Sequence, residues 1–116
     1  MKATRHKIDY EALKRLNPGI GDAKKKNYLG AANEHRVVGD LLMKGFCVYR
    51  SCSPNASCDI VCFKENSRPI KLEVKTGYYT LAGTTAHSKI TSRENFDVLA
   101  IVFHDKIVYQ PSLESI

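Results

Sequence analysis

The sequence predicts a single α/β domain with a mixed α+β arrangement, in which one β-sheet packs against at least one long helix. The chain has 116 residues, which is the size of one domain. Its composition, 43% hydrophobic and 26% charged, is ordinary for a globular protein and excludes disordered, collagen and coiled-coil classes. The hydrophobic pattern is helical before residue 45 and strand-like after it. No internal repeat is visible.

Two helices are expected in the first part of the chain. Residues 9–16 form a short helix with Asp9 as its N-cap. Residues 23–44 form a longer helix, which begins after Asp22 and ends at Gly45 because glycine favours the left-handed conformation of a helix C-terminus.

Strands are expected wherever short apolar or alternating runs lie between turn residues. They cover residues 46–49, 59–63, 70–75, 96–103 and 107–109. The run 96–103 is almost continuously apolar, which is typical of a central strand buried on both faces. The polar stretch 76–95 is long for a plain connection, so it is either functional or contains an element that the pattern does not define.

The charge distribution favours a polyanionic partner. The chain carries 18 Lys and Arg against 12 Asp and Glu, a net charge of +6. Residues 1–36 alone hold nine basic and four acidic residues, a net of +5. Nucleic acid is the commonest partner of such a basic segment, and a solvated, solubilising tail is the alternative.

No membrane association is expected. No apolar run approaches the roughly 20 residues that span a bilayer, and no apolar stretch follows the basic N-terminus as in a signal peptide. A cytoplasmic location is therefore expected.

The cysteines do not suggest a metal site. They stand at positions 47, 52, 58 and 62 without a Cys-x-x-Cys pair, and the histidines are irregularly spaced. A zinc site is therefore not favoured, and disulfides are not expected in a cytoplasmic chain. Cys47 and Cys62 lie in strand-like runs, so we expect both to be small buried hydrophobic residues.

The run 70–75 brings acidic and basic side chains together. Because side chains alternate along a strand, Glu73 and Lys75 share one face, about 7 Å apart. Asp59 begins the preceding strand, so its carboxylate approaches Glu73 if the two strands are hairpin neighbours. The alternative for an isolated Glu-x-Lys is a water-facing strand surface.

Glu34 is a third candidate acid. It shares a helical stripe with Val38, Leu41 and Ala31, which places it on the sheet-facing side together with the apolar residues; Leu42 belongs to the same apolar side. A buried acid requires a partner. For Glu34 alone, the alternative is an ion pair at the helix margin.

Three carboxylates and a lysine suit metal-dependent phosphodiester hydrolysis. Carboxylates are the hard oxygen ligands that Mg²⁺ prefers, and Mn²⁺ can substitute for it. A bound metal lowers the pKa of a water molecule and neutralises phosphate charge. A neighbouring lysine orients or deprotonates the attacking water and stabilises developing negative charge.

These motifs together resemble the PD-(D/E)XK nuclease superfamily, over roughly residues 28–111. The matching pieces are Glu34 on a helix, the strand start Asp59-Ile60-Val61, and Glu73-Val74-Lys75 on the next strand. Lys75-Thr76-Gly77 and the segment from Asp97 to Pro111 are also similar to small endonucleases of this superfamily, namely the group I intron homing endonucleases and the archaeal-type Holliday-junction resolvases.

The resemblance implies a restriction-endonuclease-like core, a central mixed sheet flanked by helices, over residues 28–116. Residues 1–27 would be a basic N-terminal arm. Asp59 and Glu73 would ligate the metal with the Val74 carbonyl, Lys75 would act on the water, and Glu34 would complete the acidic cluster. The proline that precedes the aspartate in the family is Cys58 here, with Pro54 further upstream.

Several residues are candidates for DNA contacts, since cations and polar donors bind backbone phosphates. They are Lys24, Lys25, Lys26, Arg36, Tyr78, Lys89 and Arg93. The alternative for each residue of the polar stretch is an ordinary surface loop. No base-reading motif, such as a helix-turn-helix, is recognisable.

The sequence thus predicts a Mg²⁺-dependent DNA endonuclease of the structure-selective resolvase type or of the homing type. Cutting two strands requires two sites, so a homodimer or a larger symmetric assembly is expected. The alternatives are a non-catalytic nucleic-acid-binding module on the same fold and a structural or protein-interaction subunit.

Overall fold

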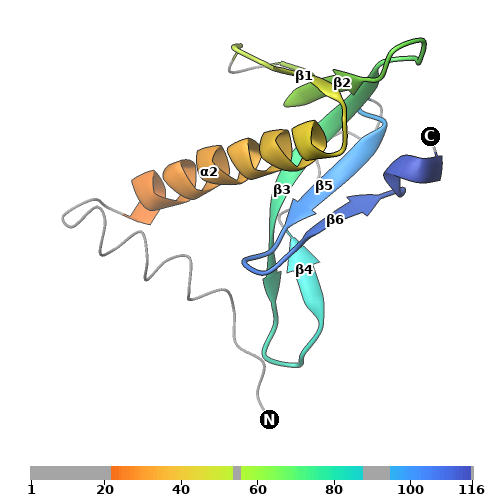
Figure 1. Ribbon diagram of the computed structural model, residues 1–116. Coiled ribbons are helices and arrows are strands. Elements are labelled where there is room, and N and C mark those ends of the chain that lie inside the picture. The colour runs from red at the N-terminus through yellow and green to blue at the C-terminus, as the bar shows by residue number, and fades with distance from the viewer. Residues whose placement is uncertain (1–21, 54–55, 88–94, 116) are drawn as a thin grey trace.

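The computed structural model describes residues 22–53, 56–87 and 95–115 (Figure 1). Within them, one α-helix and six strands form an α+β fold, which confirms the predicted class. The elements are α2 (Asp22–Met43), β1 (Cys47–Arg50), β2 (Ile60–Phe63), β3 (Ile70–Tyr79), β4 (Thr85–His87), β5 (Val98–Val102), β6 (Ile107–Gln110) and the 3-10 helix η1 (Leu113–Ser115). The helix expected over residues 9–16 lies outside the described residues.

Helix α2 ends where the sequence predicts. Gly45 has a φ of +89°, a conformation that side chains rarely adopt. Its N–H donates to the Leu42 carbonyl, and the Phe46 N–H donates to the Leu41 carbonyl, both at 3.0 Å. These two bonds form a Schellman motif, which satisfies carbonyls at the helix end. The boundary expected between residues 27 and 28 falls inside this helix.

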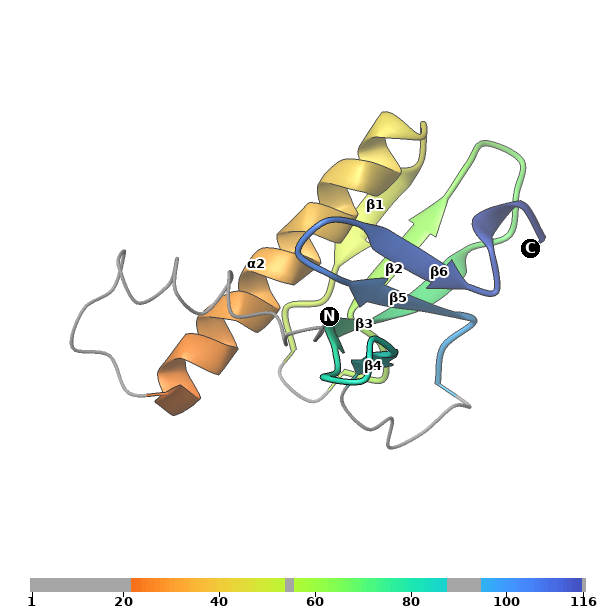
Figure 2. The same cartoon turned by 90° about the horizontal axis from the view of Figure 1, so that it is seen from below.

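The strands form one mixed sheet in the order β1-β2-β3-β5-β6, and β4 pairs with the far end of β3 (Figures 1 and 2). Strands β3 and β5 are parallel, and the other pairs are antiparallel. Each predicted strand is therefore present. The hairpin relation that the sequence analysis assumed for β2 and β3 is correct.

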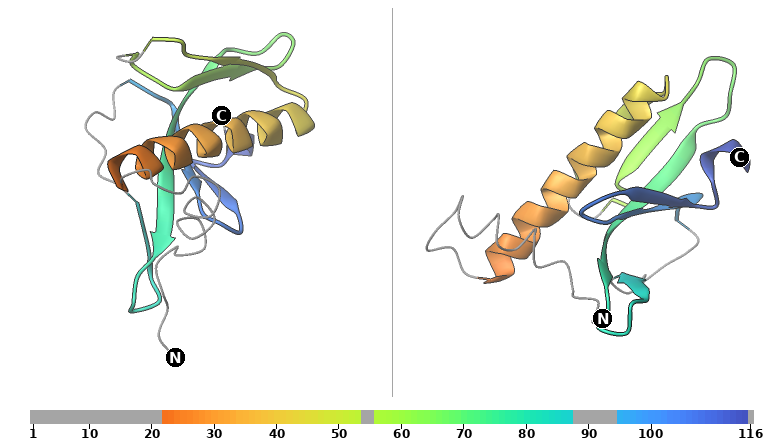
Figure 3. Two further views of the ribbon diagram at one scale, coloured as in Figure 1. Left: turned by 90° about the vertical axis from the view of Figure 1, so that its left-hand side faces the viewer. Right: turned by 60° about the horizontal axis from the view of Figure 1, so that its bottom comes forward.

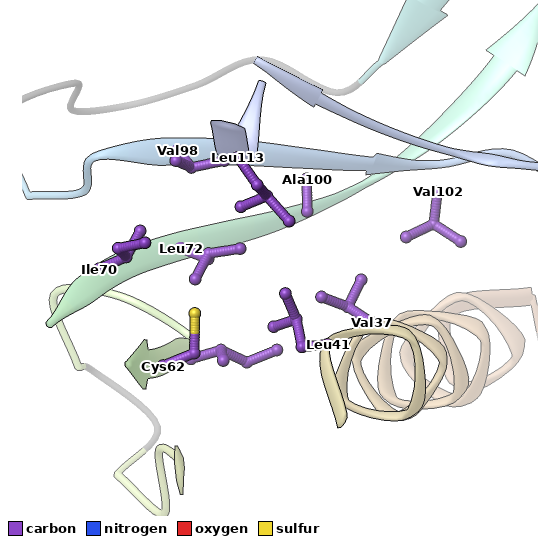
Figure 4. Close-up of a cluster of buried hydrophobic side chains, with 10 residues drawn as sticks. Val37, Leu41, Cys62, Ile70, Leu72, Val98, Ala100, Val102 and Leu113 are labelled. Carbon is purple, nitrogen blue, oxygen red and sulfur yellow. The ribbon is translucent and has the colours of Figure 1, made fainter. Parts of the chain in front are cut away.

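One face of the sheet is covered by α2, and the main core lies between them (Figure 4). Figure 4 shows helix side chains pointing at those of β2, β3 and β5. Val37 and Leu41 are fully buried there. Burying a side chain of this size stabilises the fold by about 1.5–3 kcal/mol.

The predicted apolar stripe of the helix was partly wrong. The buried positions are Leu29, Asn33, Val37 and Leu41, which recur every four residues. Leu42, expected on the apolar side, is 55% exposed. Asn33 and Val37 therefore face the sheet, whereas the prediction had placed their neighbours Glu34 and Val38 there. Helices pack through rows of residues spaced four apart, and the row that faces the sheet here begins one residue earlier than predicted.

Burial also tests the strand and cysteine predictions. All five residues of β5 are buried, which confirms its central position between β3 and β6. Cys62 is buried in the core, as expected. The same expectation was wrong for Cys47, which is exposed because β1 lies at the edge of the sheet. The described helix is not long and apolar enough to form a membrane span.

Strand β3 is longer than predicted. It continues past residue 75 to Tyr79 and then pairs with β4, so the undefined polar stretch contains the end of one strand and a further strand. The β3–β4 hairpin extends beyond the rest of the sheet (Figures 1 and 3). This extension begins at Gly77, where a Cβ atom would lie 2.6 Å from Ile101 Cγ2 and 2.7 Å from Phe103 Cε1.

We expect Gly77→Ala to destabilise the protein by about 1–3 kcal/mol, because Ile101 and Phe103 are buried and cannot move away cheaply. The matched control is Gly39→Ala in α2, where a Cβ meets no atom within 4 Å. That change should stabilise the protein by about 0.5–1 kcal/mol. Urea denaturation of both variants measures these differences, and equal stability of Gly77→Ala and wild type would contradict the close packing.

Candidate active site

The β2–β3 register brings two carboxylates together. Ile60 pairs with Leu72 at the end of the antiparallel ladder, and Asp59 immediately precedes this pair. The Asp59 N–H donates to the Leu72 carbonyl at 3.0 Å and the Asp59 carbonyl accepts from the Ser51 N–H at 2.9 Å, so the backbone of Asp59 is held between β1 and β3. Besides burial, the charge of Asp59 raises the pKa of Glu73, so the two carboxyl groups are close neighbours.

A backbone hydrogen bond orients the Asp59 side chain. The Val74 N–H donates to Asp59 Oδ2 at 2.8 Å across the two strands. This contact fixes the carboxylate beside the strand that carries Glu73 and Lys75. Because Leu72 points into the core under α2, the alternating Glu73 and Lys75 of β3 point to the opposite face of the sheet.

Lys75 completes the group. Its Nζ lies 3.6 Å from Glu73 Oε2, and the two side chains are only 21% and 23% exposed. Burial raises the pKa of Glu73, and the charge of Asp59 raises it further, while Lys75 opposes the rise. The raising effects of burial and of Asp59 outweigh the lowering effect of Lys75. Two carboxyl groups and one lysine thus share this position.

The structure does not bring Glu34 into this group. Its Oε1 accepts a hydrogen bond from Arg50 Nε and forms an ion pair with Arg50 Nη2, both at 3.0 Å. Arg50 pairs with Ile60 in the ladder, so it points to the α2 side of the sheet. Among the described residues, no three His, Cys, Asp or Glu side chains lie close enough to share a metal ion.

The predicted acidic cluster is thus corrected to a pair of carboxylates with a separate Glu34–Arg50 ion pair. The Glu34–Arg50 ion pair nevertheless lies near Asp59 in the fold. Ser51, the residue after Arg50, donates its N–H to the Asp59 carbonyl at 2.9 Å. The role of Glu34 in metal binding stays a prediction that requires this ion pair to open.

The candidate DNA-binding residues fall into different settings. Lys24 and Lys26 are exposed near the start of α2, with Lys25 between them partly buried. Arg36 has a structural contact, because its Nη1 donates to the Phe103 carbonyl at 2.8 Å and connects α2 to the end of β5. Tyr78 lies near the end of β3, half-buried. Lys89 and Arg93 lie outside the described residues.

Lys71 is a site residue to which the sequence analysis assigned no role. It is exposed on the same face of β3 as Glu73. Burial raises the pKa of the adjacent Cys58 thiol, and Lys71 opposes this rise, while Asp59 and Glu73 add to it. Lys71 therefore acts electrostatically on the same small region as the two carboxylates. The alternation along β3 was the signal that could have identified it.

A second missed contact orients the strand from its other face. Asn33 is 2% exposed, and its Nδ2 donates to Thr76 Oγ1 at 3.0 Å. Thr76 immediately follows Lys75, so this buried hydrogen bond positions the strand next to the site. A groove of about 240 Å³ adjoins Asp59 and is lined by β1, the segment before Asp59 and the start of β2.

Comparison with known proteins supports a nuclease-like fold. Among solved structures, the chain is similar to the bacterial homing endonuclease I-Ssp6803I, with a TM-score of 0.55 and 17% sequence identity. The match covers 73% of this chain and 64% of the homing endonuclease chain. At this identity the likeness shows the fold alone. No protein-family model matches the sequence, and no curated protein matches it.

We expect Glu73→Gln to be more stable than wild type at pH 7 in EDTA, with the difference vanishing below about pH 4.5. A carboxyl group whose folded-state pKa lies above the unfolded value of 4.5 stabilises the fold only while protonated. This contribution is lost as the pH rises through the folded-state pKa, and glutamine avoids the loss. Thermal melts at pH 4 and pH 7 measure the effect.

Glu65→Gln is the control for this experiment, because Glu65 lies exposed in the turn between β2 and β3. Its stability should stay within about 0.5 kcal/mol of wild type at both pH values. A Glu73→Gln protein that is less stable than wild type at pH 7 would contradict a raised pKa of Glu73.

Proposed function

We propose that this protein is a metal-dependent DNA endonuclease of the PD-(D/E)XK type, which hydrolyses phosphodiester bonds at Asp59, Glu73 and Lys75. The observation that carries the proposal is the pairing of β2 with β3, which brings two carboxylates and a lysine close together. The similarity to a homing endonuclease fold supports the same reading.

The donor set fits a hard divalent cation. Asp59 and Glu73 offer neighbouring carboxylate oxygens, since burial and then the charge of Asp59 raise the pKa of Glu73, and the Val74 carbonyl is the further ligand we propose. Mg²⁺ takes one or two carboxylates together with phosphate oxygens and waters, and Mn²⁺ is the expected substitute. When bound, the metal supplies charge neutralisation at the phosphate and a water of lowered pKa.

The lysines act on the phosphate and the attacking water. Lys75, at 3.6 Å from Glu73, is placed to orient the water and to stabilise negative charge that develops on the phosphate. Lys71 lies two residues before Glu73 on the same face and is exposed, so we assign it to a neighbouring backbone phosphate. The Val74 N–H fixes Asp59, so the pair is arranged before DNA binds.

DNA is the proposed partner, and a homodimer or larger symmetric assembly is the proposed working form. The net charge of +6 favours a polyanion. One described chain carries one such site, and a duplex or a junction has two strands to cut. Symmetric pairing of two copies supplies the second site.

We expect Asp59→Asn, Glu73→Gln and Lys75→Met each to reduce cleavage at least about a hundredfold, because each removes a metal ligand or the cation beside the reacting phosphate. DNA binding should persist in all three variants. The measurement is a Mg²⁺-dependent cleavage panel on linear duplex, nicked duplex, flap and four-way junction. Preference for the junction or flap identifies the resolvase type, and preference for one duplex sequence identifies the homing type.

Lys64→Met is the matched control for Lys75→Met, since Lys64 lies over the Phe46 ring at 4.7 Å and away from the carboxylates. It should cleave like wild type. Binding of DNA without cleavage of any substrate would overturn the enzyme and favour the non-catalytic binding module. Failure to bind DNA even at low salt would favour a structural or protein-interaction subunit.

Metal binding itself is expected to raise the melting temperature of wild type, because an ion that binds only the folded state stabilises it. Addition of Mn²⁺ or Mg²⁺ to the EDTA-treated protein should give this shift, and it should be absent in Asp59→Asn and in Glu73→Gln. An equal shift in wild type and Asp59→Asn would place the ion elsewhere.

A further inference from the structure

The far end of β3 and β4 form a two-stranded ribbon (residues 77–87) that extends beyond the rest of the sheet (Figures 1 and 3). Its ladder pairs Gly77 with His87, Tyr78 with Ala86 and Tyr79 with Thr85. The ribbon is anchored through Tyr79, in the last pair before the turn, which packs on Phe103 with ring centroids 5.1 Å apart. The Tyr79 hydroxyl also donates to Asp105 at 2.9 Å. The projecting strand pair is thus connected firmly to the body.

The tip of the ribbon is pre-organised. The Thr80 N–H donates to the Thr84 carbonyl at 2.7 Å, and the two threonine hydroxyls lie 2.7 Å apart. The Gly83 N–H donates to the Thr80 carbonyl at 3.0 Å, and Gly83 has a φ of +86°, which favours glycine. These contacts satisfy the turn internally, so the tip keeps its shape without support from the rest of the protein.

The tip presents an apolar side chain to solvent. Leu81 is 65% exposed, and residues 81–85 are all exposed. No Asp or Glu occurs between residues 74 and 93, so nothing acidic on the ribbon opposes a polyanion. A rigid, uncharged ribbon with an exposed leucine and threonine is suited to base edges rather than to phosphates.

We propose that this ribbon is the sequence-reading element of the endonuclease, and that it enters the major groove with Leu81 against a thymine methyl group and Thr85 at an adjacent base edge. The major groove admits a two-stranded β-ribbon, and apolar contacts there recognise the thymine methyl. The inference rests on the proposed function and adds to it a substrate class: duplex DNA with a defined sequence near the cut.

Strand β3 sets the distance between the proposed base-contacting residue Leu81 and the proposed catalytic residue Lys75. Lys75 and Leu81 are six residues apart, which at the usual strand rise is at most about 20 Å. The same length along a DNA duplex is about six base pairs. The bases that Leu81 contacts therefore lie within about six base pairs of the scissile phosphate.

The connection to the site favours DNA over a protein partner for this surface. Glu73 and Lys75 stand on the same uninterrupted strand as the ribbon. Any DNA that reaches the carboxylates therefore passes near the ribbon. A second copy of the chain at the tip is the competing occupant, and the experiment distinguishes the two.

The test selects binding sequences from a randomised duplex library in EDTA, with wild type, Leu81→Ser and the control Leu42→Ser. Leu42 is also an exposed leucine, 55% accessible on α2, so its change matches Leu81→Ser in chemistry. Wild type and Leu42→Ser should enrich the same motif. Leu81→Ser should lose preference at one or more positions within about six base pairs of the cut mapped in Mg²⁺.

Replacing the contacted thymine with deoxyuridine removes the methyl group alone. This change should weaken binding by wild type roughly three- to tenfold and leave Leu81→Ser unaffected. A wild type that enriches no sequence, or a Leu81→Ser protein with the wild-type motif and affinity, would overturn the inference.

Analytical sedimentation measures the number of subunits in the wild-type and Leu81→Ser assemblies. If Leu81→Ser changes this number but selects the same DNA motif as wild type, the inference is overturned and the tip is assigned to a contact between subunits. Sequence-specific binding that depends on Leu81, without any cleavage, would support the ribbon and refute the enzyme. The two proposals therefore fail separately.

Discussion

The antiparallel pairing of β2 with β3 is the interaction on which the site depends. It places Asp59 beside the strand that carries Glu73 and lets the Val74 N–H orient the aspartate. A shift of one residue would turn each side chain to the other face and separate the carboxylates. The same shift would expose Ile60 and Leu72, which are fully buried, so core packing secures the register that brings the two carboxylates together.

Strand β3 then connects three parts of the molecule. Its first half packs into the core under α2, its middle carries Glu73 and Lys75, and its last residues form the projecting ribbon with β4. The parallel contact with β5 and the Asn33–Thr76 hydrogen bond restrain it from the side and from the helix. The proposed catalytic group and the proposed recognition element thus lie on one restrained strand and have a constant separation, which a nuclease with a defined cut position requires.

Local patterns were sufficient for most of the fold. Alternation in residues 70–75 gave the correct faces, Gly45 marked the helix end, and the apolar run before Phe103 indicated the central strand, since each is a property of neighbouring residues. The helix face was harder to predict. Leu42 and Val38 follow the same period as the buried Val37 and Leu41, and only the position of the sheet selects between rows one residue apart.

The carboxylate pair could be inferred from the chain alone, because Asp59 and Glu73 belong to adjacent strands joined by a short turn. Glu34 could not be placed in this way, since its partner Arg50 is 16 residues away on a different element. The ribbon was also invisible as a pattern, because Thr, Gly and Tyr in residues 76–87 suit a loop as well as a strand. Local sequence thus specifies the elements and their faces, whereas long-range packing chooses ion-pair partners and the length of a strand, because the free energies involved arise between segments distant in the chain.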